Sequence, residues 1–216
     1  MTARGRFITL EGGEGAGKST QLRRLAEWLE SQGQPVLQTR EPGGSPGAED
    51  IRRLLVEGEP DRWLPWSETL LFFAARFDHV ARTMRPALAA GRWVLCDRFA
   101  DSTVAYQGAA GGISFGRLTE LYWLVLGDFE PDLTIVLDLP VEVGMARARS
   151  RDGVAPARFE RKDRAFHARV RDGFATIVTL NPQRCVMVDA DADVDTVAAR
   201  IRAVVAERLG LPGGHA

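Results

Sequence analysis

The eight residues from Gly12 to Ser19, GGEGAGKS, limit what this chain can fold into more than any other segment. They fit the pattern GxxxxGK[ST], whose glycines let the backbone turn so tightly that successive N–H groups converge on one point. An apolar run of strand length, RFITLE, precedes the pattern, and residues 18–31 continue it with apolar side chains at helical spacing. Because the positive end of a helix dipole and a lysine both attract anions, this arrangement predicts a phosphate-binding loop. We expect its residues to be Gly12, Gly13, Glu14, Gly15, Ala16, Gly17, Lys18, Ser19 and Thr20.

Short apolar runs alternate with longer stretches of helical spacing along the rest of the chain. The runs of strand length are residues 6–11, 35–39, 92–97, 133–139 and 185–189. The helical stretches are residues 18–31, 66–89, 117–126, 160–179 and 193–208. Alternation of strand and helix is typical of right-handed βαβ units. We therefore expect an α/β fold with three layers, a parallel five-stranded sheet with helices on both faces, in a single domain over residues 1–216.

Composition narrows the classes of protein to which the chain can belong. A formal net charge of −1 and a hydrophobic fraction of 45% are typical of a globular protein and give no indication of nucleic-acid binding. Because the N-terminal residues contain no signal-like apolar run and no window reaches the roughly 20 apolar residues of a membrane span, we expect a cytoplasmic protein. Cys96 and Cys185 lie in apolar runs without a CxxC pattern, which favours buried thiols over a disulfide or a zinc site.

Polar and glycine residues follow the first three predicted strands. The carboxyl ends of parallel strands share one edge of the sheet, where ligands of open α/β folds bind. Glu11, residues 40–44, and Asp97 with Arg98 all fall at this edge. Many buried strands end in an aspartate for reasons of turn geometry, so Asp97 alone leaves both interpretations open. Beside the predicted phosphate loop it indicates a Mg²⁺ site made by Ser19 and Asp97.

Three classes of nucleotide-binding protein share this loop. A GTPase switch should carry NKxD and DxxG segments, and neither string occurs in the chain. A motor or transporter ATPase should bring further domains. A small-molecule kinase remains.

The chain resembles the bacterial thymidylate kinases from Phe7 to about Asp189. The resemblance is carried, in this order, by the blocks EGGEGAGKST, TREPGGS, LLFFAAR, DRFADSTVAYQG and PDLTIVLDL. It implies a P-loop nucleoside monophosphate kinase that transfers the γ-phosphoryl group of ATP to dTMP in dTTP synthesis, with ATP as co-substrate and Mg²⁺ as cofactor. It also implies a homodimer, with residues 118–129 as a candidate interface or as core, and neither nucleic acid nor membrane as partner. The alternatives are a kinase of another pyrimidine monophosphate and a nucleotide-dependent switch protein.

Five residues are matched by this resemblance to the base and sugar of the acceptor. Phe72 resembles the aromatic residue that stacks on thymine, although core packing also explains an aromatic side chain there. Arg76 resembles the arginine that donates to the base, and a guanidinium favours the O4 acceptor of thymine over the amino group of cytosine. Thr103 and Gln107 resemble base contacts. Tyr106 resembles the ring beneath the sugar that leaves no space for a 2′-hydroxyl group.

Further residues are matched to the phosphates. Arg98 resembles the residue between donor and acceptor phosphates, where a delocalised cation suits charge that spreads over several oxygens. Arg52 resembles the arginine that holds the monophosphate, with Arg53 as the alternative. Glu41 is expected to orient that site, and Ser102 to bind substrate.

A cluster of arginines implies a lid at about residues 147–161. Family members can carry an arginine inside the phosphate loop, where this chain has Ala16, and bacterial members use lid arginines to meet the transition-state charge. A solvated basic surface is the alternative. Ala157 departs from the acidic residue that the family often has there. We expect the catalytic residues to be Lys18, Arg98, Arg149, Arg151 and Arg158.

Overall fold

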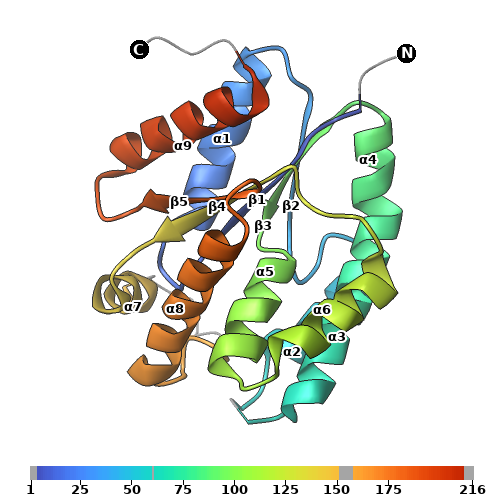
Figure 1. Cartoon of the computed structure of the whole chain (residues 1–216), viewed down its shortest axis with the longest axis vertical. Coiled ribbons are helices and arrows are strands. Elements are labelled where there is room, and N and C mark those ends of the chain that lie inside the picture. The colour runs from blue at the N-terminus through green and yellow to red at the C-terminus, as the bar shows by residue number, and fades with distance from the viewer. Residues whose placement is uncertain (1–3, 60, 151–157, 212–216) are drawn as a thin grey trace.

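Five parallel strands form one sheet in the order β2-β3-β1-β4-β5 in the computed structural model, which describes residues 4–59, 61–150 and 158–211 (Figure 1). The strands are β1 (Phe7–Gly12), β2 (Val36–Arg40), β3 (Trp93–Asp97), β4 (Leu133–Asp138) and β5 (Cys185–Asp189). The central strand β1 pairs with both β3 and β4, so that Leu10 lies beside Asp97 on one side and Ile135 on the other. The predicted parallel five-stranded sheet is confirmed.

Helices connect the strands. They are α1 (Lys18–Ser31), α2 (Pro46–Val56), α3 (Pro65–His79), α4 (Arg85–Ala89), α5 (Ala100–Thr103), α6 (Phe115–Leu126), α7 (Val141–Arg149), α8 (Arg164–Leu180) and α9 (Val194–Leu209), with π-helical segments η1 (Val80–Met84) and η2 (Val104–Ala110). The stretch predicted as one helix over residues 66–89 is divided into α3, η1 and α4. Pro86 lies at the start of α4, and since proline has no N–H to donate, a regular helix cannot continue through it.

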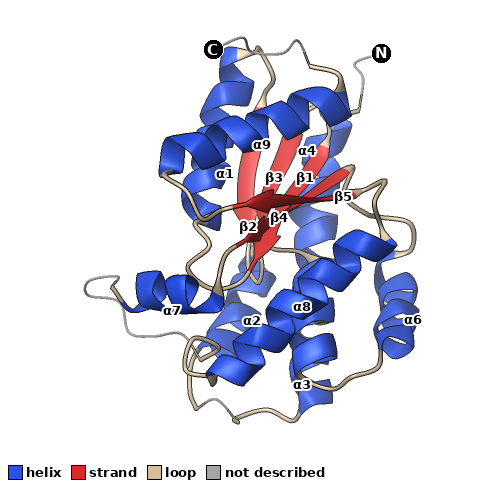
Figure 2. Ribbon diagram, turned by 60° about the vertical axis from the view of Figure 1, so that its left-hand side comes forward, coloured by secondary structure: helices blue, strands red, loops and turns tan. Residues whose placement is uncertain are grey.

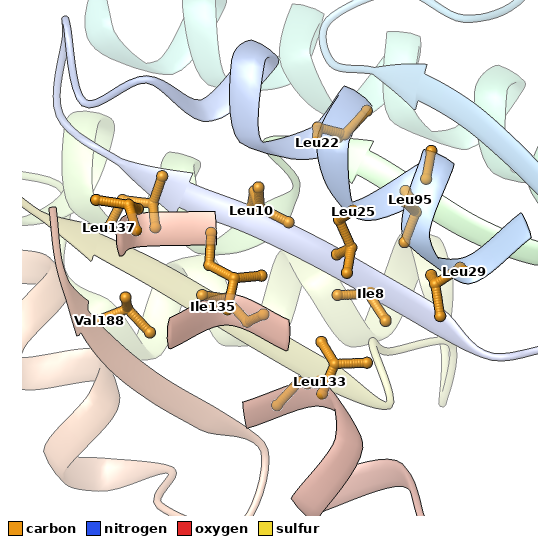
Figure 3. Packing of buried hydrophobic residues seen from close by; sticks show 14 of the residues in the cluster. Ile8, Leu10, Leu22, Leu25, Leu29, Leu95, Leu133, Ile135, Leu137 and Val188 are labelled. Carbon is orange, nitrogen blue, oxygen red and sulfur yellow. The ribbon is translucent and has the colours of Figure 1, made fainter. Parts of the chain in front are cut away.

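The sheet is the middle of three layers (Figure 2). On one face α1 and α9 pack against alternate residues of the strands. Figure 3 shows Leu22, Leu25 and Leu29 of α1, one helical turn apart, reaching Ile8 and Leu10 of β1. Burial of each such leucine contributes about 2 kcal/mol to stability. This layer therefore holds the helix that begins in the phosphate loop rigidly on the sheet.

The opposite face is covered by η1 with α4, by α5 with η2, and by α8. Val94 and Cys96 of β3 pack there against Met84, while Val136 of β4 packs against Phe174 of α8. The sequence spacing did not predict α5 and η2, because the small and polar residues of this segment carry little apolar periodicity. This unpredicted segment carries several of the expected substrate contacts.

Two smaller expectations can be compared with the structure. Both cysteines are buried and unpaired, as predicted. Among the described residues, no helix is long and apolar enough to cross a membrane, and the cytoplasmic location stays a prediction.

Candidate active site

A cavity of about 610 Å³ lies at the carboxyl ends of β1, β2 and β3. Residues 14–20 line one side of it. Side chains from α2, α3 and η2, including Phe72 and Arg76, line the other side, together with Phe159 and Glu160 from the chain that precedes α8. The polar edge predicted from the strand ends is therefore a concave site large enough for small molecules.

The phosphate loop depends on two glycines at which a side chain would clash. Gly12 has φ 135° and Gly15 has φ 70°, in the region that side-chain-bearing residues rarely adopt. A Cβ atom would lie 2.5 Å from the carbonyl oxygen of Leu137 at Gly12, and 2.1 Å from that of Gly144 at Gly15. The loop thus packs closely on β4 and α7 while its other side faces the cavity.

Lys18 folds back across this loop. Its Nζ donates to the carbonyl oxygens of Gly12, at 3.2 Å, and Gly13, at 2.8 Å. Burial, together with the neighbouring charge of Arg98, lowers the pKa of Lys18 to about 8. An ammonium group held in this environment gains stabilisation when a phosphate enters, since the anion supplies the negative charge that the loop lacks.

Ser19 and Asp97 meet at the floor of the cavity. The Ser19 hydroxyl donates to Oδ2 of Asp97 over 2.6 Å, and both residues line the cavity. Mg²⁺ prefers such oxygen ligands and takes only one or two from protein, because waters and phosphates complete its shell. The described residues contain no group of three or more His, Cys, Asp or Glu side chains placed to hold a metal. The pair fits the predicted Mg²⁺ site.

Arg98 joins the two sides of the cavity. Its guanidinium donates to the Gly12 carbonyl at 3.0 Å, to Ser102 Oγ at 3.1 Å, to Glu14 Oε1 at 2.9 Å and to Tyr106 Oη at 3.1 Å. Its backbone has φ 72°, and its N–H binds the Leu10 carbonyl at 3.0 Å. A non-glycine residue in this conformation costs about 1–2 kcal/mol, and such strain is typical of functional sites.

Glu14 and Tyr106 complete this cluster. Tyr106 donates to the same Glu14 oxygen at 2.9 Å. Burial raises the pKa of Glu14, but the charges of Arg98 and Lys18 outweigh that effect and lower it to about 2. The carboxylate therefore stays ionised and fixes the orientation of both partners.

Arg76 belongs to a buried network of hydrogen bonds beside the cavity. Its Nε donates to Glu41 Oε2 at 2.6 Å, and one terminal nitrogen, Nη2, binds the Phe99 carbonyl and Thr103 Oγ1, each at 3.2 Å. His79 Nδ1 lies 3.1 Å from the other oxygen of Glu41. The remaining nitrogen, Arg76 Nη1, is buried and has no hydrogen-bond partner among the described residues. Since Arg76 lines the cavity, this donor is suited to an acceptor atom of a ligand.

The other expected acceptor contacts are gathered at the same cavity. Arg52 is half-buried, lines the cavity and donates to the Pro42 carbonyl at 2.6 Å, whereas Arg53 is exposed and binds Asp50 on the surface of α2. Phe72 is half-buried beside Phe159, with ring centroids 6.0 Å apart. The remaining expected contacts that line the cavity are Glu41, Ser102, Thr103, Tyr106 and Gln107.

Of the predicted lid arginines, the structure describes Arg149 and Arg158 and brings neither of them to the cavity. Arg151 lies outside the described residues, and Arg149 is exposed at the end of α7 without lining the cavity. Arg158 is 1% exposed; its Nε donates to the Leu55 carbonyl at 2.9 Å and its Nη2 to Glu68. The Arg158 guanidinium is thus held in a buried ion pair and does not line the cavity, and its expected catalytic role stays a prediction. Arg147, on α7, does line the cavity.

Sequence reasoning assigned no role to several buried groups around the site. Glu11 accepts from the Phe99 N–H at 2.6 Å and from Ser102 at 2.5 Å, and burial, together with Asp101, raises its pKa to about 8. Glu68 binds both Gln107 and Arg158. A polar residue within an otherwise apolar strand was a signal for Glu11, whereas Glu68 occupies an ordinary position near the start of a helix.

Comparisons with known proteins identify the family to which the chain is similar. Residues 10–201 match a family model described as thymidylate kinase. The chain is 58% identical over 207 residues to a curated thymidylate kinase of Caulobacter vibrioides, with 96% of this chain and 99% of that one covered. It is 55% identical to one of Nitrobacter winogradskyi, with 95% and 90% covered. A crystal structure of thymidylate kinase from Ehrlichia chaffeensis superposes with a TM-score of 0.76 at 34% identity, covering 94% of this chain and 99% of that one.

Proposed function

The chain belongs to the thymidylate kinase family, and we propose that it transfers the γ-phosphoryl group of ATP to dTMP, giving dTDP and ADP. The observation that carries this proposal is a cavity lined by the phosphate loop and by Phe72 and Arg76, whose Nη1 is buried and has no hydrogen-bond partner among the described residues. A kinase of a cytosine monophosphate would need a different arrangement of donors in that pocket, because cytosine has an amino group in place of O4. A switch protein would need no acceptor pocket.

On the donor side, residues 12–20 hold the phosphates of ATP. Lys18 supplies a full positive charge, and the N–H groups at the start of α1 supply partial ones. Ser19 and Asp97 would hold Mg²⁺, which neutralises charge on the phosphate oxygens when bound. The burial of Lys18 strengthens its interaction with a phosphate because little water screens it.

On the acceptor side, Phe72 stacks on thymine and Arg76 donates to O4. Thr103 and Gln107 contact the same base, and Arg52 holds the monophosphate. Tyr106 lies beneath the sugar and excludes a 2′-hydroxyl group. The half-buried Phe72 ring and the cavity-facing Arg52, as opposed to its exposed neighbour Arg53, support this assignment.

The chemical step needs no strong general base. An oxygen of the dTMP phosphate, already anionic, bonds to the γ-phosphorus while the bond from that phosphorus to the bridging oxygen of ADP breaks. Arg98 contacts both sides of the cavity and is suited to charge that spreads over donor and acceptor oxygens. Catalysis then consists of positioning and charge neutralisation. The roles assigned to Arg149 and Arg151 remain predictions from sequence.

We also propose a homodimer through the adjacent helices α3 and α6 (Figure 1). Each helix exposes more than half of two large apolar side chains, Leu70 and Phe77 on α3, and Trp123 and Leu124 on α6. Within the segment 118–129, Leu118 and Phe129 are instead buried in core. Large apolar side chains exposed on neighbouring helices favour an interaction surface. A light-scattering mass near that of one chain would contradict the dimer.

The activity is tested by incubating the purified protein with MgATP and each of dTMP, dUMP, UMP, dCMP, CMP, dGMP and AMP, with ADP release and product identity followed together. We expect dTDP to form preferentially, with weaker activity on dUMP and little on ribonucleotides. If another monophosphate is preferred, the assignment of the phosphate loop still holds, but the assignment of the residues that contact the base is wrong. ATP or GTP hydrolysis without any acceptor would favour a switch protein.

A further inference from the structure

Glu68 is a buried acid that the proposed chemistry does not use. It lies near the start of α3, and its side chain is 12% exposed. One carboxylate oxygen, Oε1, accepts from Gln107 Nε2 at 2.7 Å, and the other, Oε2, accepts from Arg158 Nη2. A single carboxylate thus connects α3, η2 and the chain that precedes α8.

The contact with Glu68 determines which end of the Gln107 amide is available to a ligand. A carboxylate accepts hydrogen bonds and has none to donate, so the amide atom that faces it must be the nitrogen. Gln107 lines the cavity, and its carbonyl oxygen, Oε1, has no hydrogen-bond partner among the described residues. The carbonyl is therefore the group that Gln107 can offer to a base.

Arg158 keeps the carboxylate in this orientation. Its guanidinium Nε is bound to the Leu55 carbonyl at 2.9 Å, and its backbone N–H lies 3.4 Å from the Val56 carbonyl oxygen, so the residue is attached to the end of α2. With Oε2 engaged by a buried cation, Glu68 has only Oε1 for Gln107. In this arrangement Arg158 holds the Glu68 carboxylate in place.

We propose that Glu68 is a positioning residue for base selection, acting through the Gln107 amide; this inference rests on the function proposed above. An amide carbonyl accepts from the N3–H of thymine or uracil. Cytosine has an acceptor at N3, which would face that carbonyl without a hydrogen between them. Arg76 then donates to O4 and Gln107 accepts from N3–H, so the two residues contact adjacent positions on the same edge of the base.

The test is the variant Glu68→Gln, which keeps the shape of the side chain and can either accept or donate. The Gln107 amide is then no longer fixed. We expect kcat/KM for dTMP to fall about tenfold, the effect of one buried hydrogen bond, and for dUMP to fall by the same factor. The KM for ATP should stay unchanged, and dCMP, measured as a substrate and as a competitive inhibitor, should bind no worse. The preference for dTMP over dCMP should therefore fall about tenfold.

A matched control is Glu59→Gln. Glu59 lies in the connection between α2 and α3 and also pairs with an arginine of the chain before α8, Arg161, at 3.5 Å, but its side chain is 78% exposed. We expect this variant to keep the wild-type kcat/KM for all acceptors. Thermal melts of both variants will show whether either substitution disturbs folding.

A second arm asks whether Glu68 acts through Gln107. In a Gln107→Met background, Glu68→Gln should change kcat/KM for dTMP less than twofold. Equal losses for dTMP, dUMP and dCMP, or full additivity of the two substitutions, would overturn the proposal. Absence of dTDP from the wild-type protein would instead overturn the proposed function, so the two failures are distinguishable.

Discussion

The donor and acceptor sides of the cavity are built by different means. The donor side is one continuous segment, residues 12–20, in which glycine conformations and backbone groups form the site. The acceptor side is assembled from α2, α3, η2 and the residues after 158, and its side chains are fixed by buried carboxylates. Glu41 binds Arg76, Glu68 binds Gln107 and Arg158, and Glu14 binds Arg98 across both halves.

This difference has an energetic consequence. A backbone cradle keeps its shape when one of its side chains is changed, because the N–H groups stay where the turn places them. A pocket held by buried ion pairs loses its shape when one partner is removed, since the other charge is left without compensation. Substitutions on the donor side should therefore affect chemistry, and those on the acceptor side should affect folding and binding together.

The largest effect should come from Lys18→Ala on the donor side. Loss of a buried charge that meets the developing negative charge should lower kcat by about 10³-fold. The dissociation constant of dTMP, measured by calorimetry, should change less than about twofold, because the acceptor pocket is intact. Turnover near the wild-type value would contradict the role of Lys18, and a large loss of dTMP affinity would contradict the independence of the two sides.

Next in size is Glu41→Gln on the acceptor side. The side chains of Arg76 and Glu41 are only 2% and 4% exposed, so the variant leaves a buried guanidinium unpaired. We expect a loss of about 3 kcal/mol in the free energy of unfolding, measured in urea, and a higher KM for dTMP. Asp50→Asn is the control, since its pair with Arg53 is exposed on both sides and should contribute less than about 0.5 kcal/mol. If the two variants have equal free energies of unfolding, the buried ion pair contributes no more to stability than the exposed one.

Tyr106→Phe should have a smaller effect at the junction of the two sides. The variant retains the ring and loses the hydroxyl group that binds Glu14 and Arg98. We expect kcat/KM for dTMP to fall about tenfold while the preference for deoxyribose is kept. Tyr106→Ala should lose that preference, measured with ribothymidine 5′-monophosphate. If the phenylalanine variant accepts the ribonucleotide as well, the hydroxyl group and not the ring excludes it.

The smallest effect concerns pH and Glu11, which lies beneath both sides beside Asp101 and Arg98. Its pKa is about 8, above the ordinary 4.5, so the folded protein holds a proton that the unfolded chain releases between these values. The resulting stability is full below pH 4.5 and is lost as pH rises through 8. Glu11→Gln cannot ionise, so its Tm should fall less than that of wild type between pH 5 and pH 8. Parallel Tm curves would contradict the raised pKa.

The sequence predicted the sheet and the phosphate loop because both depend on neighbours in the chain. Each predicted strand lies within one or two residues of its observed bounds, and α1 begins at Lys18 as expected. Arg52 and Arg53 could not be separated by sequence alone, because their directions depend on how α2 packs. The ion pair of Glu68 with Arg158 joins residues 90 positions apart, and no local pattern indicates such a contact. The expected substrate contacts that line the cavity stay predictions in their roles.

Because the pKa of Lys18 is lowered to about 8, this side chain can take up a proton near neutral pH. At pH 8 a substantial fraction of empty molecules carries a neutral amine at the phosphate loop. Phosphates favour the ammonium form, so each nucleotide that binds should draw a fraction of a proton from the buffer. The observed enthalpy of ATP binding should then vary with the ionisation enthalpy of the buffer at pH 8 and hardly at all at pH 6.5. A rise in pH through 8 should therefore weaken ATP binding, because the empty phosphate loop loses the positive charge of Lys18.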